Sequence, residues 1–188
     1  MAEILQSEFV RFASRGYWLM FTLLVAARGM DFLSTWIATP NMVLEGNPVA
    51  KKLGWRGGIP VNLGLCALLA FWPLPAIVLV TTSVLVAARN FQSAWLMRSL
   101  GEHLYRDWHV ERVQETRASL YVFCLLGQTM LTASVGVVLI YCSNRSQDNA
   151  LIPTAIGMGI VAYAVAVAFF TLLAVYRMRR AARLQSDL

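Results

Sequence analysis

The sequence has little charge: Asp, Glu, Lys and Arg make up 14% of its 188 residues, against about a quarter in soluble domains. In place of charge it holds 58% apolar residues, and its mean hydropathy is +0.59. This composition excludes an ordinary soluble domain. It also excludes disorder, because disordered chains are poor in large apolar residues. The sequence therefore predicts an integral membrane protein with room for four or five membrane spans.

Cysteine and histidine are also scarce. The three cysteines Cys66, Cys124 and Cys142 are odd in number and lack metal-type spacing, so we interpret them as small buried apolar residues. The two histidines, His103 and His109, point to different sides of a regular helix and lie outside the predicted spans. The sequence also lacks Walker, Gly-x-Ser-x-Gly and alcohol-phosphotransferase motifs. We therefore expect no metal site and no cofactor.

The basic residues do not indicate nucleic-acid binding, although the net charge is +6. They cluster beside the apolar runs, in residues 89–117 and 177–183, where they act as topology signals and contacts for anionic lipids. Most of them fall on the inner side when the C-terminus is cytoplasmic. We therefore expect the inner membrane of a prokaryote, with the C-terminus and residues 89–117 in the cytoplasm.

The apolar runs predict an all-α fold, a polytopic transmembrane bundle with one amphipathic helix that lies at the cytoplasmic interface or extends the preceding span. We expect a single membrane domain, residues 1–188. Its expected spans are residues 17–39, 58–72, 75–88, 118–142 and 151–176, and its interfacial helix is residues 91–115.

The second apolar run leaves the number of spans open. Residues 58–88 as one helix would be roughly 46 Å long, too long for a hydrocarbon core of about 30 Å. Pro73 and Pro75 interrupt the run, and proline disfavours a continuing helix. A tight helical hairpin, which gives five spans, is the preferred interpretation. One long kinked helix, which gives four, is the alternative.

Two charged residues in the first predicted span are the strongest functional signal. Arg28 and Asp31 lie roughly 15–20 Å past Trp18 along the helix, at a depth where an ionisable group costs at least about 2.5 kcal/mol. Their i, i+3 spacing allows pairing. One interpretation is an ion pair that fixes helix packing, and the other is a ligand, proton or ion site.

A polar stripe leads from this pair into the loop that follows. Thr35 continues the face of Asp31, and Glu45 and Asn47 lie beyond the end of the span. Gly46 and Pro48 suit a chain that turns back on itself. We therefore expect Glu45 or Asn47 to approach Asp31, so that Arg28, Asp31, Thr35, Glu45 and Asn47 form one ligand-binding cluster.

The segment Asp31-x3-Thr35 followed by Glu45-Gly46-Asn47-Pro48 resembles a prokaryotic family of small polytopic membrane proteins. In that family an Asp and a Thr one turn apart in the first helix precede a Glu-x-Asn-Pro loop motif. The resemblance covers residues 24–90 and departs from the family at Arg28, where an uncharged residue is expected. The family is uncharacterised, so the resemblance implies a membrane fold and no activity.

Two functions fit these residues. The first is binding of a small ligand, lipid or ion as an accessory subunit or transport element. The alternative is a membrane-embedded enzyme acting on a lipid head group, which needs His103 or His109 near the loop. The expected partners are membrane lipids, with other membrane subunits or further copies of the chain left open. Gln128, Thr132 and Gly136 share a helix face and predict a packing seam.

Overall fold

A computed structural model of the chain describes residues 9–45, 47–145 and 151–186. These residues form helices and no strand. The helices are α2 (Arg15–Ala38), α3 (Pro48–Leu69), α4 (Pro73–Leu100), α5 (Glu102–Glu115), α6 (Ala118–Arg145) and α7 (Leu151–Ser186). The predicted all-α bundle is confirmed.

Local sequence explains where these helices begin and end. The Ser14 hydroxyl accepts a hydrogen bond from the Tyr17 N–H at 3.3 Å and caps α2. The Asn47 side chain caps α3 in the same way, with Pro48 in the first turn. Gly101 separates α4 from α5 because its φ of 80° is a backbone conformation that favours glycine.

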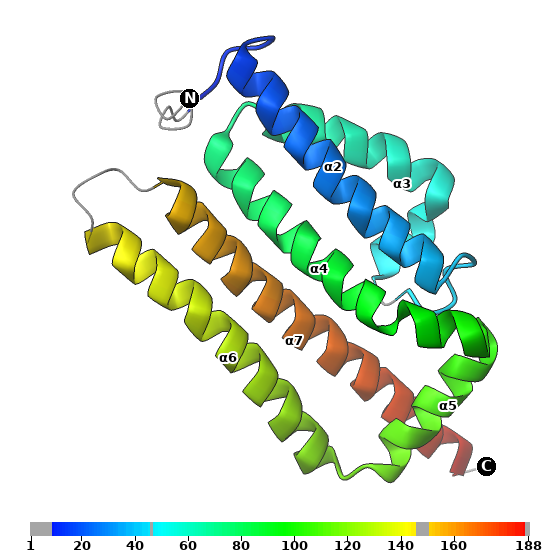
Figure 1. The fold of residues 1–188 in the computed structure, drawn as a ribbon. Helices are drawn as coiled ribbons and strands as arrows, with labels where there is room; N and C mark the ends of the chain where they lie inside the picture. The colour runs from blue at the N-terminus through cyan, green and yellow to red at the C-terminus, as the bar shows by residue number, and fades with distance from the viewer. Residues whose placement is uncertain (1–8, 46, 146–150, 187–188) are drawn as a thin grey trace.

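Four helices stand in a row, with α3 against one side of it. Figure 1 shows the order α2, α4, α7 and α6, with α3 beside α2 and α5 crossing the end of the row. The chain reverses direction between α2, α3 and α4 and again between α6 and α7, so α2 begins at one end of the bundle and α7 finishes at the other. The loop 39–47, α5 and the end of α7 share that second end.

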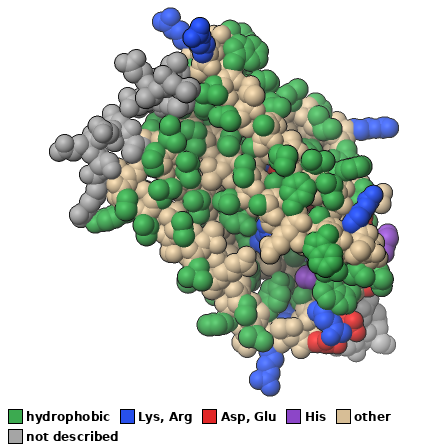
Figure 2. Space-filling view, in the orientation of Figure 1, with side chains coloured by type: hydrophobic (Ala, Val, Ile, Leu, Met, Phe, Trp, Pro, Cys, Tyr) green, Lys and Arg blue, Asp and Glu red, His purple; other side chains and the backbone are tan. Residues whose placement is uncertain are grey.

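Among the described residues, four helices are long and apolar enough to cross a membrane: α2, α4, α6 and α7. Large apolar side chains on them are exposed, among them Phe123 (74%) and Leu131 (72%) on α6. Figure 2 shows apolar side chains over the middle of one face and most visible charged side chains near its edges. These features identify a membrane protein, because a monomer in water rarely exposes so much apolar surface.

Some helix bounds differ from the predicted ones. The chain breaks at residues 70–72, where the Pro-x-Pro motif predicted a hairpin. However, α3 begins ten residues before the predicted start of its span at 58, and it contains a kink at Gly54 (φ 59°). The short span 75–88 and the first part of the interfacial helix 91–115 form one helix, α4, because nothing before Gly101 interrupts it. Only α5 is a separate helix across the bundle end.

Glycines allow α7 to pack closely between its neighbours. A Cβ atom on Gly136 of α6 would lie 2.6 Å from the Gly157 carbonyl oxygen of α7, and one on Gly159 would lie 2.6 Å from Thr81 of α4. Gly136 therefore belongs to the helix seam, as predicted. Gln128 does not, because its side chain is exposed.

The cysteines do not share one environment. Cys66 is buried as expected, whereas Cys124 and Cys142 are exposed on α6, so the prediction of burial is wrong for those two. Both lie on a helix that contacts mainly α7 and leaves its other faces uncovered in the part of the chain that the structure describes.

Candidate functional site

Arg28 joins three helices. Its Nη1 donates to Asp31 Oδ2 at 2.7 Å on its own helix, α2, and to Ser83 Oγ on α4 at 3.2 Å. Its Nε donates to Asn62 Oδ1 on α3 at 2.9 Å, and its guanidinium lies 5.8 Å from the centre of the Phe32 ring. The guanidinium is therefore held on several sides by the protein.

Asn62 is itself fixed in this arrangement. Its amide Nδ2 donates to the Gly58 carbonyl oxygen one turn earlier at 2.8 Å, which turns Oδ1 toward Arg28. Sequence reasoning missed Asn62 and Ser83, because each lies on another helix and their meeting with Arg28 depends on packing. Asparagine in an otherwise apolar helix was the available signal.

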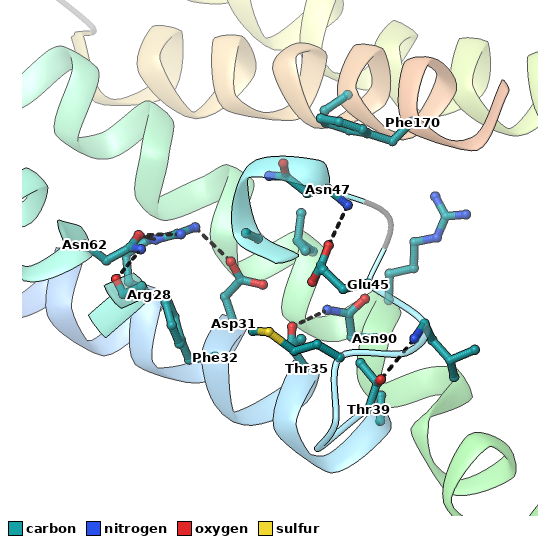
Figure 3. A pocket seen from close by; sticks show the side chains of 18 of the residues that line it. Arg28, Asp31, Phe32, Thr35, Thr39, Glu45, Asn47, Asn62, Asn90 and Phe170 are labelled. Carbon is teal, nitrogen blue, oxygen red and sulfur yellow. Dashed lines mark hydrogen bonds and ion pairs between the residues drawn. The ribbon is translucent and has the colours of Figure 1, made fainter. Parts of the chain in front are cut away.

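A cavity of about 480 Å³ lies next to this arrangement, between α2, α4, α7 and the start of α3. All five residues of the predicted cluster line it: Arg28, Asp31, Thr35, Glu45 and Asn47. Figure 3 shows the carboxylates of Asp31 and Glu45 turned toward the same space, one from α2 and one from the loop. The loop thus folds back over the polar stripe.

Local hydrogen bonds hold the loop in this position. Glu45 Oε1 accepts from the Asn47 N–H at 2.7 Å, and Asn47 Oδ1 accepts from the Val49 N–H at 3.0 Å. The Trp55 indole N–H donates to the Pro40 carbonyl oxygen at 2.9 Å, which ties α3 to the beginning of the loop. Glu45 and Asn47 are therefore placed by the cap that starts α3.

Asn90 on α4 is a further polar residue of the cavity that the sequence did not reveal. Its Nδ2 lies 3.3 Å from Thr35 Oγ1 and 3.3 Å from Ser34 Oγ, so it fixes the Thr35 hydroxyl beside the cavity (Figure 3). Arg89, the neighbouring residue, also lines the cavity. The charged lining therefore comprises two arginines, Arg28 and Arg89, and two carboxylates, Asp31 and Glu45.

Glu102, the first residue of α5, binds the other end of the loop. Its Oε2 accepts from the Thr39 hydroxyl at 2.8 Å and the Val43 N–H at 3.1 Å, and its Oε1 accepts from the Asn41 N–H at 2.9 Å and the Asn41 side chain at 3.1 Å. Thr39 in turn accepts from the Leu44 N–H at 3.1 Å. One carboxylate, 8% exposed, thus organises the segment that leads to Glu45.

These contacts shift the acidity of Glu102. Burial raises the pKa of its carboxyl, but the hydrogen bonds from Asn41, Thr39 and Val43 outweigh burial and hold the pKa below its ordinary value of 4.5. Glu102 is therefore ionised in the folded chain at neutral pH. No sequence motif pointed to it, because its partners lie about sixty residues away and half of them are backbone N–H groups.

The opposite end of α5 is held by α7. Arg179 Nη2 donates to the carbonyl oxygens of Val113 at 3.0 Å and Thr116 at 2.7 Å, the last carbonyls of α5. A cation suits a helix C-terminus because of the helix dipole. With Glu102 at one end and Arg179 at the other, α5 is fastened to both halves of the bundle.

The histidines of α5 lie apart from the cavity. Neither His103 nor His109 lines it. The His109 ring stacks on Tyr105 at 5.9 Å, and burial lowers the pKa of His109. Among the described residues no three His, Cys, Asp or Glu side chains lie close enough to hold a metal ion.

Comparison with protein-family models, with curated proteins and with solved structures gives no match for this chain. The family resemblance of residues 24–90 therefore stays a prediction, and the functional argument depends on the cavity itself.

Proposed function

We propose that this chain is an integral membrane protein that binds the positively charged group of a small ligand, ion or lipid head group in the cavity beside Arg28. The observation that carries the proposal is the pair of carboxylates, Asp31 and Glu45, which come from different elements and line one cavity. Arg28 pairs with Asp31 at 2.7 Å, whereas Glu45 has no ion pair among the described residues, so a bound cation would add an opposite charge beside Glu45.

Hydrogen bonding within the protein leaves each carboxylate one oxygen for a ligand. Arg28 binds Asp31 through Oδ2, and the Asn47 N–H binds Glu45 through Oε1. Among the described residues no donor binds Asp31 Oδ1 or Glu45 Oε2. Arg28 is shared with Asn62 and Ser83, so its charge is only partly available to the acids.

The alternative, an enzyme acting on a lipid head group, has less support. It needs a histidine at the loop for acid–base or metal chemistry, and the cavity is lined by neither His103 nor His109. A binding role, as an accessory subunit or transport element, needs only the groups that line the cavity.

The expected location is the inner membrane of a prokaryote, with lipids as partners and the C-terminus in the cytoplasm. The bundle end that carries the loop, α5 and the end of α7 also holds Lys51, Lys52 and the arginines of α5. Cytoplasmic ends of membrane proteins are enriched in such residues, which supports this orientation. The cavity then lies toward the cytoplasmic side.

Thermal unfolding of the purified protein in detergent, with and without ethanolamine or sodium ion, tests the proposal. A ligand at about 100 times its Kd adds about 2.7 kcal/mol of stability. For a chain of this size that corresponds to a Tm rise of roughly 5–10 °C. We expect at least one of these cations to stabilise the wild type in this way.

Two matched variants identify the site. Glu45→Gln keeps the oxygen that accepts from Asn47 but removes the charge, so the stabilisation by the cation is lost. Glu111→Gln, at an exposed carboxylate paired with Arg112, keeps the stabilisation. The proposal is contradicted if the cation stabilises Glu45→Gln as much as the wild type, or if neither cation stabilises the wild type.

A further inference from the structure

A second cavity, of about 560 Å³, lies between α2 and α3. Its walls are mostly apolar and include Val25, Leu33, Ile59 and Leu63. Leu33, Ile59 and Leu63 are 44%, 58% and 50% exposed, so this cavity is a groove open to the surroundings of the bundle. In a membrane those surroundings are lipid hydrocarbon.

The groove and the polar cavity share one wall. Four residues line both: Arg28, Phe32, Trp55 and Asn62. Arg28 and Asn62 are hydrogen-bonded at 2.9 Å, and the rings of Phe32 and Trp55 lie 6.0 Å apart. A polar compartment and an apolar compartment therefore lie on opposite sides of a single partition formed by these side chains.

The dimensions of the groove suit a hydrocarbon chain. It follows α2 from Val25 to Trp36, roughly 17 Å at 1.5 Å per residue. Half of a bilayer's hydrocarbon core is about 15 Å thick. Arg28 and Phe32, which the groove shares with the polar cavity, lie within this length, so the groove contacts part of a lipid chain that begins at the partition.

The charges of the polar cavity suit a zwitterionic head group. Asp31 and Glu45 offer acceptor oxygens for an ammonium group, and Arg89 lines the same cavity without an ion pair among the described residues. Arginine is well suited to phosphate. An anionic lipid without an ammonium group offers no cation to Glu45, which has no ion pair among the described residues, whereas Asp31 is already paired with Arg28.

We propose that the ligand is a zwitterionic phospholipid, with its ammonium at Asp31 and Glu45, its phosphate toward Arg89 and one acyl chain in the groove between α2 and α3. This inference depends on the proposed function and extends it by naming the ligand class and a second contact surface. The partition residues divide the head group from the chain.

Binding of three soluble probes to the detergent-purified protein tests the inference: O-phosphoethanolamine, lysophosphatidylethanolamine and lysophosphatidylglycerol with the same chain. We expect lysophosphatidylethanolamine to bind at least about tenfold more tightly than O-phosphoethanolamine, because a buried CH₂ contributes about 0.8 kcal/mol. Lysophosphatidylglycerol is the control for partitioning into detergent, and its binding should be at least about tenfold weaker than that of lysophosphatidylethanolamine.

Variants at glycine residues test whether the acyl chain of the lipid binds in the groove. Gly29 lines the groove, and a Cβ atom there meets nothing within 4 Å, so Gly29→Leu fills the groove without displacing backbone. Gly64→Leu is the matched control, since Gly64 has the same open space on α3 but lines neither cavity. If Gly29→Leu does not fold, Leu63→Trp with Leu65→Trp as its control replaces the pair.

The outcomes separate this inference from the proposed function. Loss of the tenfold gain in Gly29→Leu, with O-phosphoethanolamine binding unchanged, supports the acyl-chain groove. Retention of the gain in Gly29→Leu, or equal binding of the two lysolipids, overturns the inference. If O-phosphoethanolamine binds the wild type and the acyl chain of the lysolipid adds no affinity, the inference is wrong while the proposed function stands. If no probe binds, the inference is wrong, and the ethanolamine and sodium experiment decides the proposed function separately.

Discussion

Replacing Glu102 should loosen the loop that forms one wall of the cavity. The carboxylate accepts four hydrogen bonds, two of them from the backbone N–H groups of Asn41 and Val43. In Glu102→Gln the oxygen facing Asn41 can remain, whereas an amide NH₂ now faces the Val43 N–H. The amide NH₂ can donate to the Thr39 hydroxyl instead, but the Val43 N–H loses its acceptor.

The magnitude follows from these contacts. A hydrogen bond to a charged group contributes about 1.5–3 kcal/mol, and an orphaned buried donor costs about 1–3 kcal/mol. We therefore expect Glu102→Gln to lower the free energy of unfolding by about 2 kcal/mol, or roughly 4–8 °C in Tm. Glu102→Ala removes every acceptor and should cost about 3–5 kcal/mol.

The measurement is thermal unfolding in detergent between pH 3 and 8, with Glu111→Gln as the exposed control. Because the pKa of Glu102 is lowered by folding, its contribution is fully present above about pH 4.5 and is lost as the pH falls through the folded value. Wild type and Glu102→Gln should thus converge below pH 4.5. A Tm of Glu102→Gln within 1 °C of the control at pH 7 would refute the reasoning.

Three further predictions concern the bundle. Asp31→Asn and Arg28→Gln should each lower folded yield more than the double variant does, because breaking a pair leaves one charge uncompensated; additive losses would show that the two residues act independently. Gly136→Ala should cost about 1–3 kcal/mol in unfolding experiments, since its Cβ would meet the next helix at 2.6 Å, whereas Gly127→Ala, with nothing within 4 Å, should cost none. Reporter fusions should place the end of α7 in the cytoplasm and the start of α2 on the other side; a cytoplasmic start of α2 would contradict the preferred five-span interpretation and favour the four-span alternative.

Sequence periodicity and hydropathy were sufficient for the helices and for part of the site. A long apolar run in a membrane favours a helix, so α2 and α6 lie close to their predicted bounds. Helix α7 begins at its predicted start but continues to Ser186, ten residues past its predicted end at 176. The pairing geometry of Arg28 and Asp31 follows from helical spacing, and the Glu-Gly-Asn-Pro motif indicated a loop that returns toward Asp31. These are local features, within reach of a single sequence.

The remaining features depend on contacts between distant segments. Glu102 looked like one charge among many on a polar helix, yet it binds backbone groups of a loop, which no side-chain pattern encodes. Asn62 and Asn90 matter because packing turns them toward Arg28 and Thr35. The sequence left open whether residues 89–117 lie at the interface or extend the preceding span, and α4 shows that the part up to Leu100 extends it, because charge alone does not end a helix.

The position of α7 has a consequence for how this protein is made. It is the last helix in the sequence, yet it lies between α4 and α6, and it supplies Phe170 and Tyr163 to the wall of the cavity. Chains emerge N-terminal first from the ribosome. We therefore expect α2 to α6 to enter the membrane before α7 occupies its place between α4 and α6, so that the cavity is open on that side. The cavity would then be closed on that side only when α7 inserts, so binding of the proposed ligand would mark a chain in which α7 has packed against α4 and α6.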